Sequence, residues 1–265
     1  MSKANRPVSG WLERFGFKLG RAAGGAQRTF RRSIFWLGLS TAVPSLAIAA
    51  GWNPAKVSSN LGIFALSDVQ LAERKITVTP IGQLELPTGE IMACDPLVTG
   101  DDWPALSRKV KPGSYPVSLF EAQGRVAAAF LRLRPGTPVR WELATLPDQD
   151  VSTLKDDEMF GYPVDAGLGS FMDKTAMALM SAEQDKLKAD ENYYDDVLAA
   201  EFAPNQDRFV MHHPVAGNPL NIAMFWSGWG DGFYPSFWGL DAAGEPLLLL
   251  TDFGVLENAD GRESK

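Results

Sequence analysis

The chain has 265 residues, of which 45% are hydrophobic and 22% charged, a globular composition that excludes a wholly disordered or fibrous protein. Its one cysteine, Cys94, excludes an internal disulfide framework and a cysteine-rich metal site. A net charge of −7 argues against a nucleic-acid partner, because lysine and arginine dominate phosphate binding.

The charge is divided between a basic leader and an acidic body. Residues 1–32 contain eight of the 25 Lys and Arg residues and one of the 32 Asp and Glu residues, which gives +7 there and −14 in the rest of the chain. Residues 33–51 carry no charge and are largely apolar. A basic stretch followed by an apolar stretch and small residues is the order of an export signal. We therefore predict that residues 1–50 direct the protein out of the cytoplasm.

Two details refine this prediction. Ala47-Ile48-Ala49 has the small residues that a signal peptidase accepts, which predicts cleavage after Ala49. The segment 31–35, RRSIF, resembles the twin-arginine signature. Two alternatives stay open. An uncleaved anchor would contact the membrane through residues 33–51 and leave the body outside. In a cytoplasmic protein, the leader would be an amphipathic helix or the product of an over-long gene start.

Residues 57–257 are predicted to form a single β-rich domain, followed by a polar tail at 258–265. The alternating segment 83–86 and the apolar segment 91–94, joined by a turn at 87–90, predict a hairpin. Residues 115–120 and 125–133 predict a second hairpin. Further strands are expected at 139–143, 209–212, 222–226, 233–240 and 247–255. Alternation with frequent turns favours a mainly antiparallel sheet or sandwich.

One stretch has helical spacing. Ser170 and Asp173 resemble a capping box, and apolar or small residues recur after them at helical intervals. Tyr194, Leu198 and Phe202 indicate a second short helix, and the acidic residues between the two helices are expected to form a solvated face. The predicted fold class is therefore α+β, mainly antiparallel β, with one or two helices inserted at about 170–202.

Several segments of the body resemble one bacterial family. They are EIMACDP at 90–96, KPGSYPV at 111–117, RVAAA at 125–129, RWE at 140–142, VDAGLG at 164–169, GWGDGFYP at 228–235 and TDF at 251–253. Together they are similar to the domain of unknown function 4241, over about residues 75–257. This resemblance implies a family but no activity, and the basic leader departs from it.

Two glycine-rich loops, at 165–170 and 228–232, contain most of the candidate site residues. Their glycines let the backbone approach a ligand, and their aspartates supply oxygen ligands. The ligand-binding candidates are Asp165, Gly167, Gly169, Trp229, Asp231 and Tyr234. A divalent cation, Mg²⁺ or Ca²⁺, would be held by Asp165, Asp173 and Asp231, with Asp252 nearby. The same residues are also typical of structural turns and caps, and a helix start at 170 would instead favour an anion.

The histidines, the cysteine and the tryptophans are weaker candidates for a functional site. His212 and His213 lie side by side on an expected strand and so point to opposite faces. Cys94 lies in an apolar strand and is expected to be buried. The cluster of Trp226, Trp229 and Trp238 either fills a core or, where exposed, offers an anchor for a partner or a sugar-like ligand.

We predict a binding module, exported or membrane-tethered, whose partner is an unknown protein or a small polar ligand. A metal-dependent hydrolase that uses Asp165, Asp173 and Asp231 is the alternative, and a cytoplasmic protein of unknown function is the second one. The sequence contains no nucleophile-elbow, phosphate-loop or paired-histidine zinc motif. Whether the protein is an enzyme therefore stays open.

Overall fold

Short antiparallel strands separated by turns build the fold, because apolar and polar residues alternate over only a few positions at a time. The structure is a computed structural model, and it describes residues 52–58 and 60–256. The leader at 1–50, the cleavage point after Ala49 and the tail at 258–265 lie outside the described residues.

The larger sheet has six strands, all of them antiparallel to their neighbours. Their order is β1 (Thr77–Leu86), β3 (Gly113–Ala122), β4 (Arg125–Arg132), β12 (Pro246–Asp252), β11 (Ser236–Leu240) and β5 (Arg140–Leu143). Strand β5 is an edge strand and pairs with β11. Among the described residues, the outer edge of β5 therefore pairs with no other strand, and only loops lie beside it.

The second sheet has four strands, and a two-stranded ribbon accompanies it. The order in the sheet is β2 (Ile91–Cys94), β7 (Leu168–Asp173), β9 (Ile222–Trp226) and β8 (Phe209–His212). The ribbon pairs β6 (Tyr162–Val164) with β10 (Gly232–Tyr234). Strands β1 and β4 of the larger sheet contact β9, and β1 also contacts β7 and β8, so the two sheets pack on one another.

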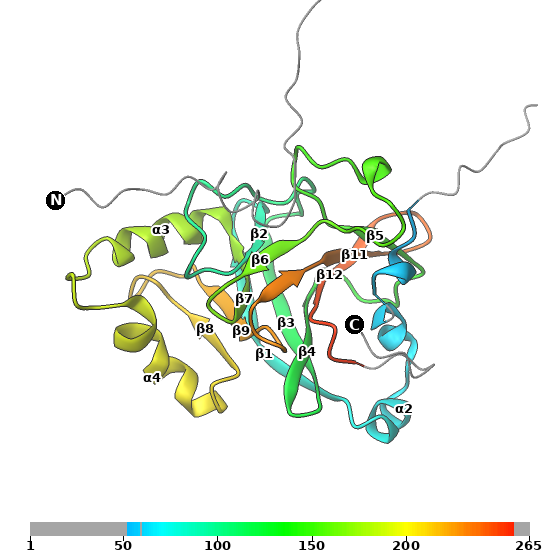
Figure 1. Cartoon of the computed structure of the whole chain (residues 1–265), viewed down its shortest axis with the longest axis horizontal. Helices are drawn as coiled ribbons and strands as arrows, with labels where there is room; N and C mark the ends of the chain where they lie inside the picture. Colours follow the sequence, from blue (N-terminus) through cyan, green and yellow to red (C-terminus); the bar gives the residue numbers. More distant parts are fainter. Residues whose placement is uncertain (1–51, 59, 257–265) are drawn as a thin grey trace, which may run out of the picture. The chain divides into compact units, whose positions relative to one another are not determined.

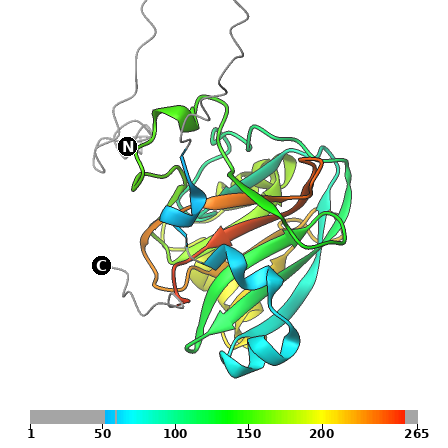
Figure 2. The ribbon, with the colours of Figure 1, turned by 90° about the vertical axis from the view of Figure 1, so that its right-hand side faces the viewer.

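The helices lie outside the sheets. Helices α3 (Lys174–Gln184) and α4 (Ala199–Phe202) contact the four-stranded sheet, and α2 (Asp68–Glu73) lies on the opposite side of the strands (Figure 1). The shorter turns of helix are η2 (Pro54–Lys56), η3 (Asn60–Ala65), η4 (Val151–Thr153), η5 (Tyr194–Leu198) and η6 (Ala203–Asn205). Figure 2 shows η2, η3 and α2 in front of the six-stranded sheet.

The core lies between the two sheets. Phe171 and Phe225 of the four-stranded sheet and Leu131 and Leu249 of the six-stranded sheet are fully buried. Burying apolar area of this kind is worth about 25 cal/mol per Å² and is the main term that holds the two sheets together. On the outer side of the six-stranded sheet, Phe64 of η3 packs edge-on against Phe120 and Phe130, with ring centroids 5.1 Å apart in both pairs.

The predicted fold class is confirmed, because the described residues form mainly antiparallel sheets with helices at 174–184 and 194–205. The expected hairpin between 83–86 and 91–94 is wrong. Strand β1 pairs with β3 and β2 pairs with β7, so the chain passes from one sheet to the other at 87–90. The expected strand 233–240 is likewise two strands in different sheets, which part at Pro235, a residue that has no backbone N–H to donate.

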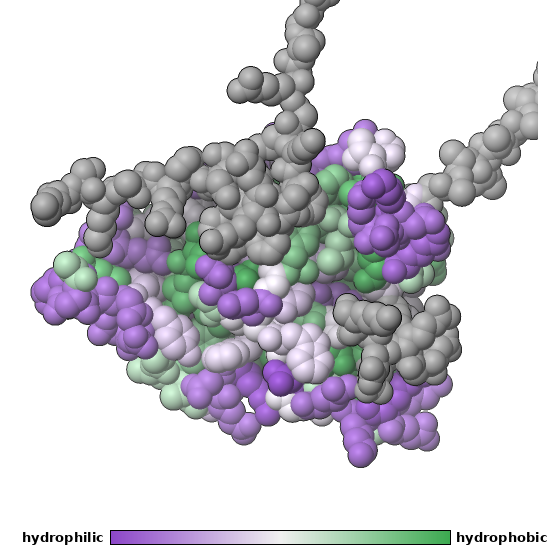
Figure 3. All heavy atoms as spheres, in the orientation of Figure 1, coloured by the Kyte–Doolittle hydropathy of each residue, from purple (hydrophilic) through white to green (hydrophobic). Residues whose placement is uncertain are grey.

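The expected helix start at Ser170 is also wrong. Residues 170–173 belong to β7, where Phe171 and Met172 are fully buried between β2 and β9. Asp173 is the N-cap of α3, and its carboxylate accepts from the Thr175 N–H at 3.0 Å. The expected solvated face after α3 is present, and Figure 3 shows polar residues gathered at that end of the molecule.

Candidate functional site

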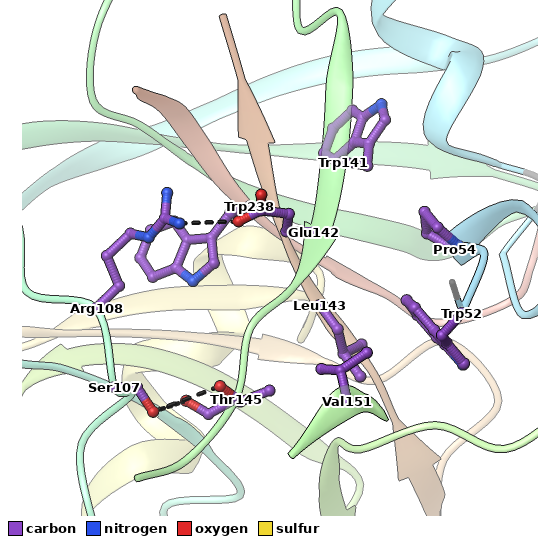
Figure 4. A pocket seen from close by; sticks show the side chains of 10 residues that line it. All are labelled: Trp52, Pro54, Ser107, Arg108, Trp141, Glu142, Leu143, Thr145, Val151 and Trp238. Atoms are coloured by element: carbon purple, nitrogen blue, oxygen red, sulfur yellow. Dashed lines mark hydrogen bonds and ion pairs between the residues drawn. The ribbon is translucent and has the colours of Figure 1, made fainter. Parts of the chain in front are cut away.

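A pocket of about 580 Å³ lies at the open edge of the six-stranded sheet. We call it the β5 pocket. Its lining residues are Trp52, Pro54, Ser107, Arg108, Trp141, Glu142, Leu143, Thr145, Val151 and Trp238 (Figure 4). The volume falls within the range of ligand pockets, about 300–1,000 Å³. Four segments that are distant in the sequence meet here, from η2, from the loop before β3, from β5 with the loop after it, and from β11.

Two half-buried tryptophans form the aromatic wall. Trp141 on β5 packs against Phe64, with ring centroids 5.5 Å apart. Trp52 is held in place by its indole N–H, which donates to the Glu158 carbonyl oxygen at 2.7 Å. Pro54 lies between the two indoles in Figure 4. Since both rings are fixed by contacts outside the pocket, they offer preorganised flat surfaces to a ligand.

A fixed ion pair forms the polar wall. Arg108 Nη2 donates to Glu142 Oε2 at 2.9 Å, and Arg140 Nη2 lies 3.0 Å from Glu142 Oε1. The Arg108 guanidinium carbon also lies 5.6 Å from the centroid of the buried Trp238 ring, which gives a cation–π contact. These contacts use one N–H donor of Arg108 and leave its remaining donors for a ligand.

Two hydroxyl groups continue this polar wall. Ser107 Oγ donates to the Thr145 carbonyl oxygen at 3.0 Å, and it lies 3.4 Å from Thr145 Oγ1. Figure 4 shows both hydroxyls on the same side of the pocket as Arg108. Since side chains alternate along β5, Trp141 and Glu142 point to opposite faces of the strand, and the aromatic and polar groups line the pocket from the two sides of this edge strand (Figure 4).

Sequence reasoning missed the β5 pocket. Its lining is spread over residues 52–238, and no local motif joins these positions. The available signal was the segment 140–142, in which one tryptophan lies between an arginine and a glutamate on an alternating strand. None of Asp165, Asp173, Asp231 and Asp252 lines the pocket.

The structure brings Asp165 and Asp231 to the same end of the β6–β10 ribbon. Gly232 pairs with Val164 at that end of the ribbon. Asp165 follows Val164 and Asp231 precedes Gly232, and both aspartates are exposed. The backbone N–H groups of Asp165 and Ala166 donate to the buried Asp95 Oδ2 at 3.1 and 2.7 Å. Burial raises the pKa of Asp95, while these bonds oppose the rise.

Gly167 and Gly169 have structural roles in this loop. Gly167 has a φ of +72°, a conformation that favours glycine. A Cβ on Gly169 would lie 2.6 Å from the Tyr162 hydroxyl oxygen and 2.8 Å from the Phe225 ring. Gly169 therefore allows the ribbon to pack closely on the four-stranded sheet.

Asp173 lies at the far end of β7 from this loop. It is the fifth residue after Leu168, which corresponds to roughly 17 Å along a strand. Its Oδ2 accepts from the Thr88 N–H and hydroxyl at 2.9 and 2.8 Å, and its Oδ1 accepts from the Thr175 N–H and hydroxyl at 3.0 and 2.7 Å. The structure does not bring Asp173 together with Asp165 and Asp231.

Among residues 52–58 and 60–256 there is no group of three or more His, Cys, Asp or Glu side chains placed to hold a metal ion. Cys94 is buried as expected, and burial raises the pKa of its thiol to about 12. His212 is also buried, whereas His213 is exposed.

The tryptophan cluster expected from the sequence is divided by the fold. Trp238 is 2% exposed, while Trp226 and Trp229 are 42% and 53% exposed. The Arg125 guanidinium carbon lies 4.5 Å from the centroid of the Trp229 ring. Tyr234 is buried, and its hydroxyl donates to the Gly230 carbonyl oxygen at 2.9 Å. Of the candidates in the glycine-rich loops, Trp229 and Asp231 are therefore accessible to a ligand, as is Asp165.

Within the described part of the chain, no helix is both long enough and apolar enough to cross a membrane. The apolar segment 33–51 lies outside the described residues.

The comparison with known proteins gives a family. A family model described as a protein of unknown function, DUF4241, matches residues 84–251, which is more than half of the chain. The match includes Arg108, Trp141, Glu142 and Trp238 and does not reach Trp52. Neither a curated protein nor a solved structure matches the chain. The resemblance predicted from the sequence is confirmed, and the chain belongs to the DUF4241 family.

Proposed function

We propose that this protein is a binding module, exported or tethered to a membrane, that holds a small polar ligand in the β5 pocket. The observation that carries the proposal is the lining of that pocket, which combines the rings of Trp52 and Trp141 with the Arg108–Glu142 ion pair. Apolar walls with a few placed polar groups are the usual composition of small-molecule sites. No observation on the described residues favours the metal-dependent hydrolase.

Binding is tested with the full chain by tryptophan fluorescence and thermal shift against a library of small polar molecules. A ligand in the β5 pocket should change the emission of Trp52 and Trp141 and raise the melting temperature, because it binds the folded state alone. Trp141→Ala should remove both effects. Trp229→Ala is the matched control, since it removes an exposed tryptophan outside the pocket lining. A ligand that binds both variants equally well would place the site elsewhere.

Export is supported by the sequence of the leader, which has a basic stretch, an apolar stretch and Ala47-Ile48-Ala49 in that order. N-terminal sequencing of protein recovered from the cell envelope should begin at Ala50 if the signal is cleaved, and at Met1 if it remains as an anchor. The double substitution Arg31→Lys and Arg32→Lys should retain the protein inside the cell. Recovery of the unprocessed chain from the cytoplasm of unmodified cells would refute export.

A further inference from the structure

We infer that the ligand of the β5 pocket is a short extended peptide that adds to the outer edge of β5 as an antiparallel strand and places an acidic side chain on Arg108; this inference rests on the proposed binding function. An extended peptide has backbone N–H and C=O groups along its edge and side chains on alternate faces. Exposed sheet edges bind extended peptides in this way. The β5 pocket has partners for both kinds of group.

The backbone of β5 has unpaired hydrogen-bonding groups at this edge. The Ala144 N–H donates to the Ser236 carbonyl oxygen at 2.8 Å, which fixes every second residue of β5 as one that hydrogen-bonds to β11. The backbone groups of Glu142 therefore point to β11, whereas those of Trp141 and Leu143 point to the open edge. Within residues 52–58 and 60–256, the N–H and C=O groups of Trp141 and Leu143 have no hydrogen-bond partner.

These groups lie in the pocket and have little contact with bulk water. Leu143 is 5% exposed and Trp141 is half-buried, and both line the pocket. Buried backbone N–H and C=O groups nearly always have a partner. Just beyond them, the Ser107 N–H donates to the Thr145 carbonyl oxygen at 2.8 Å. At Trp141 and Leu143, an added strand supplies the matching donors and acceptors at the spacing of β5.

The side chains along β5 form two subsites. Trp141 and Leu143 point to one face of the strand, on the side of Trp52, and Glu142 points to the other face (Figure 4). All neighbouring strands of this sheet are antiparallel. In an added antiparallel strand, the two residues that bond to Trp141 and Leu143 place their side chains on the tryptophan side, and the residue between them points to Arg108. One extended peptide therefore reaches both subsites.

The charge of the polar subsite favours an acidic side chain. Arg108 and Arg140 are paired with a single carboxylate, that of Glu142, so the group has a net positive charge. Arg108 uses one N–H donor for Glu142 and has others that can donate to a second carboxylate. Its guanidinium also lies against the Trp238 ring, which holds it in position before a ligand binds. A basic side chain would meet two arginines instead.

The inference is tested with the full chain by saturation-transfer NMR and tryptophan fluorescence. The probes are acetylated and amidated pentapeptides of the form Thr-X-Z-X-Thr, in which X is Leu, Val or Phe and Z is Glu, Gln or Lys. At least one peptide with Glu at Z should bind. It should bind about tenfold more tightly than the same peptide with Gln or Lys at Z, which corresponds to about 1.4 kcal/mol.

N-methylation of the peptide tests whether it adds as a strand. Methyl groups on the two X nitrogens remove the donors that face β5 and should abolish binding. A methyl group on the Z nitrogen, which points away from β5, should leave binding unchanged. Binding should also slow the solvent exchange of the Trp141 and Leu143 amide protons, because these protons then donate to the peptide.

Variants locate the two subsites. Arg108→Met removes the charge and should abolish the preference for Glu over Gln at Z. Lys109→Met is the matched control, because it removes a neighbouring charge that pairs with Glu90 outside the pocket lining. Trp141→Ala should weaken the binding of every peptide by about tenfold or more, and Trp229→Ala should weaken none. Unchanged circular dichroism shows that a variant is folded.

The outcomes separate the two proposals. Three results would overturn the peptide inference and, where Trp141→Ala abolishes the binding, leave the proposed binding function intact. They are peptide binding that survives N-methylation at X, equal binding of peptides with Glu and Lys at Z, and a ligand from the small-molecule library when no peptide binds. Absence of any binding that depends on Trp141, for the peptides and for the library, would overturn both proposals.

Discussion

His212 is buried at the end of β8, and both of its ring nitrogens have partners. Nδ1 lies 2.9 Å from Glu201 Oε2, and Nε2 lies 2.8 Å from the Tyr193 hydroxyl oxygen. An ionised carboxylate only accepts, so Nδ1 carries the proton and Nε2 accepts from Tyr193. Burial raises the pKa of Tyr193 to about 12, which keeps its hydroxyl protonated as the donor. The neutral imidazole is thus fully hydrogen-bonded.

This arrangement predicts loss of stability in mild acid. Burial lowers the pKa of His212 below its ordinary 6.5, although Glu201 opposes the effect. Since the unfolded state then binds the proton more readily, the stabilisation is present above the unfolded pKa and is lost as the pH falls through the folded one. Urea unfolding should show that wild type loses more stability than His212→Gln between about pH 7.5 and pH 5.

The exposed neighbour gives the control. His213→Gln should keep most of the pH profile of wild type, because burial is the main cause of the lowered pKa of His212 and the charge of His213 is a minor one. The comparison of variants at each pH also removes the contribution of the buried carboxyls of Asp95 and Asp252, whose raised pKa values act with the opposite sign. Parallel profiles for wild type and His212→Gln would contradict the prediction.

At the scale of elements, the junction of β7 and α3 joins three parts of the chain. Asp173 caps α3 through Thr175 and holds the 87–90 crossover through Thr88. The crossover is where the expected hairpin fails, so a single buried carboxylate fixes the point at which the chain changes sheets. The apolar pattern of 168–173 fits a strand or a helix, and pairing with β2 and β9 decides for the strand.

Asp173→Ala should therefore destabilise the protein by about 1–3 kcal/mol, from loss of an N-cap and of the hydrogen bonds that hold Thr88. Asp173→Asn keeps a capping oxygen and should cost about half as much. Urea unfolding measures both values, with Asp231→Ala at an exposed turn as the control. A loss under about 0.5 kcal/mol for Asp173→Ala would show that the carboxylate is dispensable.

At the scale of the whole molecule, a segment outside the family match completes the β5 pocket. Trp52 and Pro54 precede residue 84, where the match begins. Ser58 and the Asn60 side chain hydrogen-bond to the buried carboxylate of Asp252, and this anchors the segment to the end of β12. The family domain supplies Arg108, Glu142 and Trp141 to the pocket, and the preceding segment supplies the other tryptophan.

The sequence by itself determined the local properties of this protein. Period-two alternation placed most of the strands, Gly124 marked the turn of the hairpin β3–β4, and the apolar setting of Cys94 predicted its burial. The motifs determined the family, and the division of charge between 1–32 and the body carries the prediction of export. All of these depend on neighbours in the chain, which a sequence displays directly.

Only the tertiary structure decided which strands pair and which side chains meet. Alternation indicates which face of a strand is buried but not which strand it pairs with. The sequences of β1 and β2 therefore resemble a hairpin, although the two strands belong to different sheets. The carboxylates expected at a metal ion are separated by the length of β7. The β5 pocket joins Trp52 to Trp238 across most of the chain, because contacts between distant segments are set by the packing of whole sheets.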